Sequence, residues 1–332
     1  MKNRRFAGIL IARAAIVLIA SGMLASLAFA QADYPNKPIK ILVPFPPGGT
    51  SDVMGRMMAE PLSRILKQPV TVENVGGGGG VVGTERGVRA AADGYTIIQT
   101  GVGQNAVAHG LDADLIKRYN SNTDFIHLSQ IHHGPNVLVV NADRPFKSLK
   151  DVVQFAKANP GKLDYGYTHA SSGHMAMEQF KQTAGIFITG IPYRGGGPML
   201  TAAISNEIPF MFINQDVAFP HVKSGKLRAL AVSSLQRNPL FPDVPTVAES
   251  GYPGFQALSW SGLSIQKGTP QPIVEKLEAA IKEVMTSPAI VQRMASQGFV
   301  IPPLGQKPYA DFVAKEIVQW ERVIKTAGIK AQ

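Results

Sequence analysis

The sequence contains no cysteine among its 332 residues. This absence excludes disulfide bonds, zinc sites with cysteine ligands, iron–sulfur clusters, thiol nucleophiles and lipid anchors attached to cysteine. Charged residues are also scarce, at 17%, whereas apolar residues make up 45% of the chain. Because this composition can supply sizeable hydrophobic cores, it excludes a disordered protein, and the length predicts about two domains.

The first thirty residues have the composition of a secretory signal peptide. The cations Lys2, Arg4, Arg5 and Arg13 precede or interrupt an apolar stretch over 14–29, and 28–30 read Ala-Phe-Ala, a small-residue cleavage site. We therefore expect cleavage after Ala30 and a periplasmic mature protein. An uncleaved membrane anchor is the alternative, but the apolar run is shorter than the ~20 residues that a span needs.

The formal charge of +10 invites a nucleic-acid interpretation until its distribution is considered. Four of the 33 cations lie in the signal peptide, which has no acid, so 29 cations and 23 acids leave about +6 for the mature chain. No cluster of lysine and arginine exceeds two residues. A nucleic-acid partner is therefore not expected.

Strand-like and helix-like segments alternate along the mature chain. Strands are expected over 39–44, 70–73, 95–100, 125–131, 137–141, 164–167, 188–192, 210–213 and 227–233. Helices are expected over 52–67, up to about residue 92, from 148 to about 158, from 172, from 199, over 272–285 and over 311–327. This alternation predicts an α/β protein with parallel sheets.

Two loops rich in glycine, serine or threonine lie where a strand turns into a helix. The first covers 44–52 (PFPPGGTSD) and the second covers 167–174 (YTHASSGH). Glycine lets a backbone approach a ligand closely, and the free N–H groups of a helix start favour an anion. Each loop alone is also consistent with an ordinary capped helix, but two of them in different halves of the chain fit one carboxylate-binding cleft.

Nucleotide and metal sites find little support. There is no P-loop motif, and the dinucleotide-like run at 101–106 (GVGQNA) is interpreted as opening no periodic helix. His169 and His174 are five residues apart, which is not the spacing of helical zinc ligands, and His132 and His133 would point to opposite faces of a strand. We predict no metal and no cofactor.

Catalysis is not expected either. The run 170–173 (ASSG) lacks the first glycine of a nucleophile elbow, so no catalytic residue is assigned. His174, in the first turn of a helix, is placed either to donate a hydrogen bond to an anion or merely to cap and pack there.

The chain resembles the Bug-type solute-binding proteins of tripartite tricarboxylate transporters over 33–329. The matching runs are YPNKPI (34–39), VPFPPGGTSD (43–52), QPVTVEN (68–74), DGYT (93–96), PYRG (192–195), PHVKSGKLRALAV (220–232), PDVPTVAE (242–249) and GTP (268–270). The resemblance implies a two-lobed Venus-flytrap fold, each lobe a mostly parallel sheet flanked by helices. One lobe would comprise 31–133 plus 256–332 and the other 134–255.

The resemblance implies that two loops bind a ligand carboxylate through backbone N–H groups, hydroxyls and ordered waters. Carried onto this sequence, the binding residues are Phe45, Pro47, Gly48, Gly49, Thr50, Ser171, Ser172 and His174, with Tyr193 and Asn214 facing the same cleft. Two departures are His169, an imidazole near the mouth of the cleft, and Ile213, where relatives often carry a polar residue. An apolar wall with an extra donor suggests an aromatic carboxylate such as terephthalate.

The resemblance therefore implies a monomeric binding protein, not an enzyme, that delivers a small carboxylate to an integral-membrane permease. A sensor that signals to a membrane partner through the same fold is an alternative, and a periplasmic hydrolase is a further one.

Overall fold

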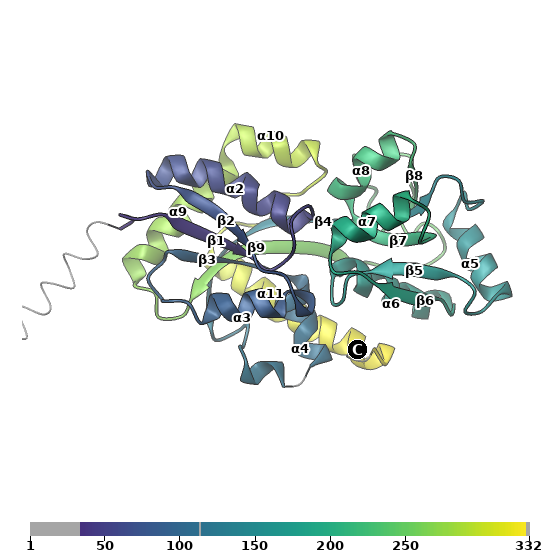
Figure 1. Cartoon of the computed structure of the whole chain (residues 1–332), viewed down its shortest axis with the longest axis horizontal. Coiled ribbons are helices and arrows are strands. Elements are labelled where there is room, and N and C mark those ends of the chain that lie inside the picture. The colour runs from purple at the N-terminus through teal and green to yellow at the C-terminus, as the bar shows by residue number, and fades with distance from the viewer. Residues whose placement is uncertain (1–33, 113, 330–332) are drawn as a thin grey trace, which may run out of the picture.

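The structure is a computed structural model that describes residues 34–112 and 114–329. The expected signal peptide, 1–30, lies outside the described residues, as does its cleavage site. Within the described ranges, no helix combines the length and apolar character needed to cross a bilayer. One mixed sheet of nine strands runs through the described molecule (Figure 1). The order along the sheet is β2 (Val70–Asn74), β1 (Ile39–Val43), β3 (Thr96–Gly101), β9 (Leu258–Gln266), β4 (Phe125–Asn141), β7 (Phe210–Asn214), β5 (Asp164–Tyr167) and β6 (Thr189–Pro192), and β8 (Leu227–Val232) pairs with β4.

The first lobe is built on three parallel strands. These are β1 (Ile39–Val43), β2 (Val70–Asn74) and β3 (Thr96–Gly101). Its helices are α2 (Thr50–Leu66), α3 (Val81–Val88), α4 (Ala108–Leu111), α9 (Gln271–Thr286), α10 (Pro288–Ser296) and α11 (Gln306–Ala327), with short turns η1 (Gly78–Gly80), η2 (Gly103–Val107) and η3 (Leu115–Lys117). Helices α2, α9 and α10 cover one face of the sheet, and α3, α4 and α11 cover the other (Figure 1).

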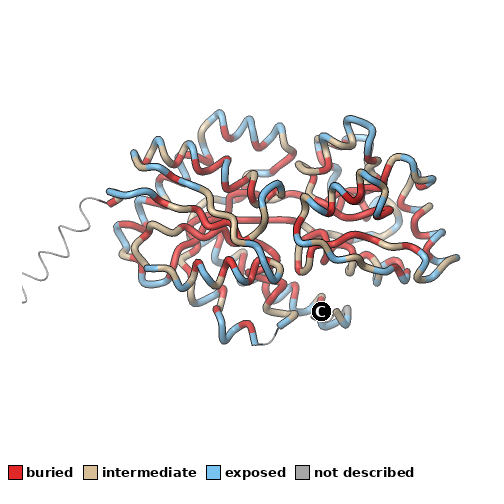
Figure 2. Tube along the Cα trace, in the orientation of Figure 1, coloured by how far each residue is buried: buried red, intermediate tan, exposed pale blue. Residues whose placement is uncertain are grey.

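Burial follows the apolar pattern of the sequence. Along α9, Ile273, Leu277, Ile281 and Val284 form one buried stripe that packs with α2 and the sheet in a single core. The inner strands of the sheet are almost continuously buried, the edge strands β2 and β6 are mostly half-buried or exposed, and the outer faces of the helices are exposed (Figure 2). The amphipathic period of α9 therefore sets which face of this helix turns inward.

Two long strands connect the lobes. β4 (Phe125–Asn141) runs through 17 residues without a break, pairing with β9 (Leu258–Gln266) in its first part and with strands of the second lobe in its last part. The sequence predicted two separate strands here and no strand at 258–266, and both expectations were wrong. Gly134 and Pro135, which look like a break, instead pair with Ser259 and Leu258.

The second lobe repeats the arrangement. Its strands are β5 (Asp164–Tyr167), β6 (Thr189–Pro192), β7 (Phe210–Asn214) and β8 (Leu227–Val232), and its helices are α5 (Leu149–Ala158), α6 (Ser172–Ala184), α7 (Gly196–Ile204) and α8 (Gln215–Lys223). β6, β5 and β7 are parallel, while β7 and β8 run antiparallel to β4. The sheet is thus parallel within each lobe and antiparallel where the crossing strands join it.

Most helix positions agree with the sequence, and the boundaries shift by a few residues. The Ser148 hydroxyl caps α5 by accepting from the backbone N–H of Asp151, whose carboxylate accepts from Ser148 in return, as the spacing predicted. The helix expected to reach residue 92 ends at Val88, and α11 begins five residues earlier than expected. Helices α4, α8 and α10 were not anticipated.

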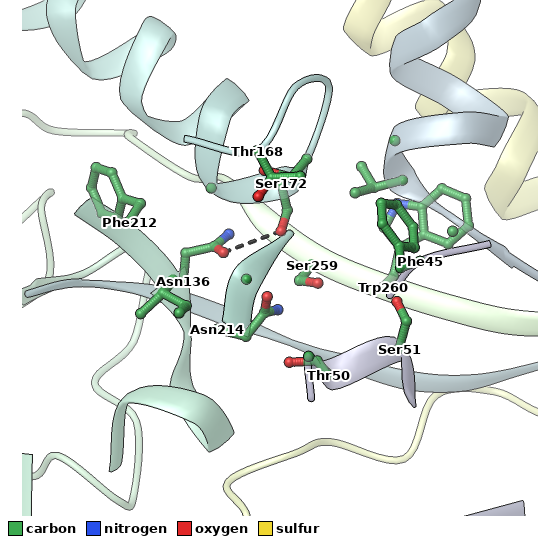
Figure 3. Close-up of a pocket in the computed structure, with 18 of the residues that line it drawn as sticks. Phe45, Thr50, Ser51, Asn136, Thr168, Ser172, Phe212, Asn214, Ser259 and Trp260 are labelled. Atoms are coloured by element: carbon green, nitrogen blue, oxygen red, sulfur yellow. Dashed lines mark hydrogen bonds between the residues drawn. The ribbon is translucent and has the colours of Figure 1, made fainter. Parts of the chain in front are cut away.

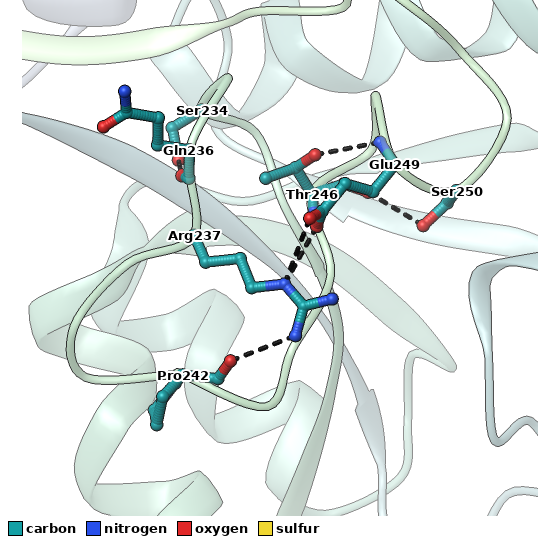
Figure 4. Close-up of polar contacts among 7 residues, drawn as sticks. All are labelled: Ser234, Gln236, Arg237, Pro242, Thr246, Glu249 and Ser250. Carbon is teal, nitrogen blue, oxygen red and sulfur yellow. Dashed lines mark hydrogen bonds and ion pairs between the residues drawn. The ribbon is translucent and has the colours of Figure 1, made fainter.

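The segment 233–257, which leads from β8 back to β9, is irregular and held by polar contacts (Figure 4). Arg237 pairs with Glu249 at 3.0 Å and donates to the Pro242 carbonyl oxygen at 3.1 Å. The backbone N–H of Thr246 donates to Glu249 at 2.7 Å. Because the ion pair is exposed, it fixes the path of this segment more than it contributes to stability.

Candidate functional site

A cavity of about 100 Å³ lies between the two lobes, on the crossing strands. The loop after β1 supplies one wall and the loop after β5 supplies the opposite one, while the ends of β7 and α7 close the second lobe's side (Figure 3). The lining residues are Phe45, Pro46, Gly49, Thr50, Ser51, Gly101, Val102, Gly103, Gln104, His132, Asn136, Thr168, Ser171, Ser172, Gly173, Gly196, Met199, Phe212, Ile213, Asn214, Ser259 and Trp260.

Six of the eleven residues expected from the sequence line this cavity. They are Phe45, Gly49, Thr50, Ser171, Ser172 and Asn214, drawn from both lobes. Pro47, Gly48, His169, His174 and Tyr193 are not part of the lining. The structure thus brings together the two loops as expected, with a smaller set of their residues at the cavity.

The loop after β1 is held from the neighbouring strand. Asn74, at the end of β2, donates from Nδ2 to the Phe45 carbonyl oxygen and to Asp52 Oδ1, each at 3.0 Å. The Gly48 N–H donates to Asp52 Oδ2 at 3.2 Å. Partial burial raises the pKa of Asp52, but hydrogen bonds from Arg56, Gly48 and Asn74 outweigh it and lower the pKa below its ordinary value.

Three helix starts converge on the cavity. Gly49, Thr50 and Ser51 open α2, Ser171 and Ser172 open α6, and Gly196 opens α7, so each helix directs its N-terminal end toward the same space. The Ser172 hydroxyl donates to Asn136 Oδ1 at 3.1 Å, which ties α6 to β4. The free N–H groups and dipoles of such helix starts stabilise a negative charge.

The two histidines of the second loop, His169 and His174, are not part of the cavity lining. His174 is 3% exposed and stacks on Tyr167, with ring centroids 4.3 Å apart. Burial lowers the pKa of His174 to about 4, so the ring is neutral at pH 7. His169 is half-buried, with its ring centroid 5.9 Å from that of His174. Tyr193 donates instead to Glu207 at 2.8 Å.

Sequence reasoning missed the floor of the cavity. His132, Asn136, Ser259 and Trp260 come from β4 and β9, and Gly101 to Gln104 come from the end of β3 and the start of η2. The run at 101–106 does open helical structure, η2 and then α4, so its interpretation as a segment that opens no helix was wrong. A strand followed directly by glycines was the available signal for this third loop.

The lining combines apolar side chains, among them Phe45, Phe212 and Trp260, with hydroxyl and amide groups, and it contains no lysine or arginine. Trp260 donates its indole N–H to Glu316 at 2.6 Å, so its polar atom is already occupied. Burial, together with the neighbouring His133, lowers the pKa of His132 to about 3, which leaves this lining imidazole neutral. Among the described residues, no group of three or more metal-ligating side chains gathers.

The lobes touch around the cavity. Thr50 Oγ1 donates to Asp216 Oδ1, on α8 of the other lobe, at 2.8 Å. Gly103 of the first lobe lies against Ala170 of the second so closely that a Cβ on Gly103 would sit 2.8 Å from the Ala170 carbonyl oxygen. The two lobes are therefore in direct contact beside the cavity.

Comparisons with known proteins agree with this class of fold. The model of the tripartite tricarboxylate transporter family receptor matches residues 54–329. Protein BugT of Bordetella pertussis is 37% identical over 298 residues, covering 90% of this chain and 91% of BugT. A Cupriavidus necator protein encoded in the gbd 5' region is 34% identical over the full length of both chains.

Solved structures give the same result. Rpa4515 of R. palustris with adipate superposes with a TM-score of 0.86 at 31% identity, covering 90% of this chain and 99% of that one. The periplasmic binding protein BugD gives 0.86 at 30% identity, covering 90% and 100%. MatC from Rhodopseudomonas palustris with bound malate gives 0.83 at 30% identity, covering 88% and 100%. The fold is that of a periplasmic solute-binding protein. The chain belongs to the tripartite tricarboxylate transporter receptor family.

Proposed function

We propose that the protein is a periplasmic receptor that captures a small organic carboxylate between its lobes and delivers it to an integral-membrane permease. The observation that carries this proposal is the convergence of α2, α6 and α7, by their N-terminal ends, on a cavity with no lining cation. Backbone N–H groups and hydroxyls can bind a carboxylate strongly without desolvating a buried cation.

Relatives support the carboxylate class. The structures of Rpa4515 and MatC contain adipate and malate, and they superpose on 90% and 88% of this chain. We propose that this chain binds its ligand with Gly49, Thr50, Ser171, Ser172 and Asn214.

The body of the ligand is proposed to be flat and apolar. Phe45, Trp260, Phe212 and Ile213 line the cavity, and of the two departures noted in the sequence, Ile213 is in the wall whereas His169 is not. An aromatic carboxylate, such as terephthalate or its single-carboxylate analogue benzoate, fits these walls. Ring faces then pack against rings while the carboxylate meets the helix starts.

A thermal-unfolding panel tests this proposal. Residues 31–332 would be purified, refolded to remove any retained ligand, and mixed with aromatic and aliphatic carboxylates, with benzamide and benzyl alcohol as uncharged controls. A ligand at a hundred times its Kd stabilises the fold by about 2.7 kcal/mol, a rise in Tm of several degrees. Shifts with carboxylates alone are expected. No shift with any carboxylate would contradict the proposal.

Delivery to a permease is tested separately in cells. Deleting the gene for this protein is expected to abolish uptake of the carboxylate identified in the panel, and restoring the gene should recover it. Uptake that continues without the protein, together with an altered transcriptional response to the carboxylate, would favour a sensor.

A further inference from the structure

A carboxylate of the chain itself reaches the edge of the cavity. Asp216, in the first turn of α8, accepts a hydrogen bond from Thr50 Oγ1 at 2.8 Å, and Thr50 lines the cavity. The backbone N–H groups of Val217 and of Asp216 itself also favour the charged form of this carboxylate. The carboxylate of Asp216 therefore occupies the position that an anion from solution would take at the start of α8.

This charge has no counterion at the cavity. None of the ion pairs among the described residues includes Asp216, and the lining holds no lysine or arginine. Burial raises the pKa of Asp216 to about 6, so the group is still mostly ionised at pH 7. His132, which lines the same cavity, is neutral and cannot offset the charge.

The hydrogen-bonding direction adds to this effect. Because the Thr50 hydroxyl gives its hydrogen to Asp216, it offers only lone pairs to the cavity. Gln104 also lines the cavity, is 2% exposed, and has its Oε1 without a partner among the described residues. Its Nε2 donates to the Gln99 carbonyl oxygen at 3.3 Å, so the free atom of this amide is the acceptor Oε1. Two acceptors and a nearby carboxylate disfavour a second anionic group.

We propose that Asp216 is a positioning residue that sets charge selectivity: by placing a carboxylate on Thr50 at the cavity edge, it makes the site prefer ligands with one carboxylate over ligands with two. The inference rests on the proposed function and deepens it. The part of the ligand beside Thr50 is then uncharged or carries a hydrogen-bond donor, such as a hydroxyl or an amide N–H.

Matched ligand pairs test the proposal. Affinities would be measured by calorimetry at one neutral pH and low salt for benzoate against terephthalate and for hexanoate against adipate. The proteins are the wild type, Asp216→Asn, and Asp243→Asn as a control that removes an exposed carboxylate of the same lobe. Asp216→Asn is expected to improve the affinity for each dicarboxylate, relative to that for its monocarboxylate partner, by about tenfold. This is the effect of one unit charge a few ångström away at a partly solvated site. Asp243→Asn should leave both ratios unchanged.

A purely structural clamp between the lobes gives a different result. Thr50→Val removes the interlobe hydrogen bond and keeps the charge at position 216. If Asp216 only holds the lobes closed, Asp216→Asn and Thr50→Val will weaken the binding of both ligands of each pair equally. Unchanged affinity ratios would then overturn the inference, while the proposed function stands. Asp216→Ser replaces Asp216→Asn if the latter fails to fold. If the wild type binds none of the four carboxylates, both the inference and the proposed ligand class are overturned.

Discussion

Asn74 holds Phe45 in place: the side-chain amide at the end of β2 donates to the Phe45 carbonyl oxygen at 3.0 Å. The two residues are 29 positions apart, yet β1 and β2 are paired in register, with Val43 opposite Asn74. The same amide also donates to Asp52, whose carboxylate accepts the Gly48 N–H. The loop after β1 is therefore shaped by the sheet and by the first turn of α2.

Replacing Asn74 by alanine should weaken ligand binding more than it weakens the fold. Three side-chain hydrogen bonds are lost, two donated by the amide to Phe45 and Asp52 and one accepted from Arg56. Each is worth about 1 kcal/mol, and their loss frees the Phe45 carbonyl and lets the loop sample other shapes. We expect Kd to rise about tenfold, measured by calorimetry with the best carboxylate of the panel. Asn159→Ala, which removes a similar side-chain hydrogen bond at the exposed end of α5, is the control. Equal Kd values for the two variants would contradict this role.

Gly103→Ala should interfere with closure of the lobes. A Cβ at this position would meet the backbone carbonyl oxygen of Ala170 at 2.8 Å, and backbone atoms of the opposite lobe can move away only if the lobes separate. Since only the closed form surrounds the ligand, a smaller closed population raises the apparent Kd, here by about tenfold or more. Small-angle scattering with saturating ligand would show a larger radius of gyration than in the wild type.

Gly185→Ala should show the opposite pattern, a loss of stability without a loss of ligand affinity. Gly185 ends α6 with φ of 61°, a left-handed conformation that strains alanine, but a Cβ there meets nothing within 4 Å. This variant should lose about 1 kcal/mol of stability and keep its ligand affinity. If Gly103→Ala behaves in the same way, the contact with Ala170 does not control closure.

The fold was largely predictable from the sequence because its strands are apolar and its helices amphipathic. β5 was predicted with the bounds that the structure shows, and the capping box of α5 was read from Ser148 and Asp151. β9 was missed because Ser259, Ser261 and Ser264 interrupt its apolar pattern, although all three are buried. In this strand, the small polar side chains are buried by pairing with β4 and β3, which no local pattern reveals.

The site was predictable where one local segment forms it. The loops after β1 and β5 carry their own glycines and helix starts, so both were found. The floor depends on long-range pairing, such as His132 opposite Ser261, and was not found. The side-chain direction of His174 was equally beyond the sequence, because stacking on Tyr167 and not its helix position decides where the ring lies.

Gly49→Val should block the cavity without unfolding the protein. Gly49 lines the cavity, has φ of −99°, which valine tolerates, and a Cβ there meets nothing within 4 Å, so the side chain extends into free space. We expect Kd to rise by at least about tenfold because the added methyl groups overlap with the ligand. The free energy of unfolding should change by no more than about 1 kcal/mol, the cost of valine at an N-cap. Gly49→Ala should give a smaller loss, and wild-type affinity in Gly49→Val would exclude this loop from the site.

Buried histidines should make the ligand-free protein sensitive to acid. Burial lowers the pKa of His127 to about 4, and His132 and His174 are also held well below 6.5. Below pH 6.5 the unfolded chain binds protons that the folded protein excludes, so the free energy of unfolding falls as the pH decreases. Each imidazole contributes about 1–2 kcal/mol of this loss between pH 7 and pH 5. Asp216 acts in the opposite direction, because its raised pKa makes the folded protein take up a proton first.

Urea unfolding at pH 7 and pH 5 measures this loss. His127→Gln keeps a polar side chain next to Ser264 and the Ser121 carbonyl but removes one titrating group. It should reduce the acid-induced loss by about 1–2 kcal/mol, even if it lowers stability at both pH values. His221→Gln, on the more open surface of α8, should change the pH dependence much less. Burial also lowers the pKa of His221, but this side chain is less buried than that of His127. An unchanged pH dependence in His127→Gln would mean that folding does not lower the pKa of His127.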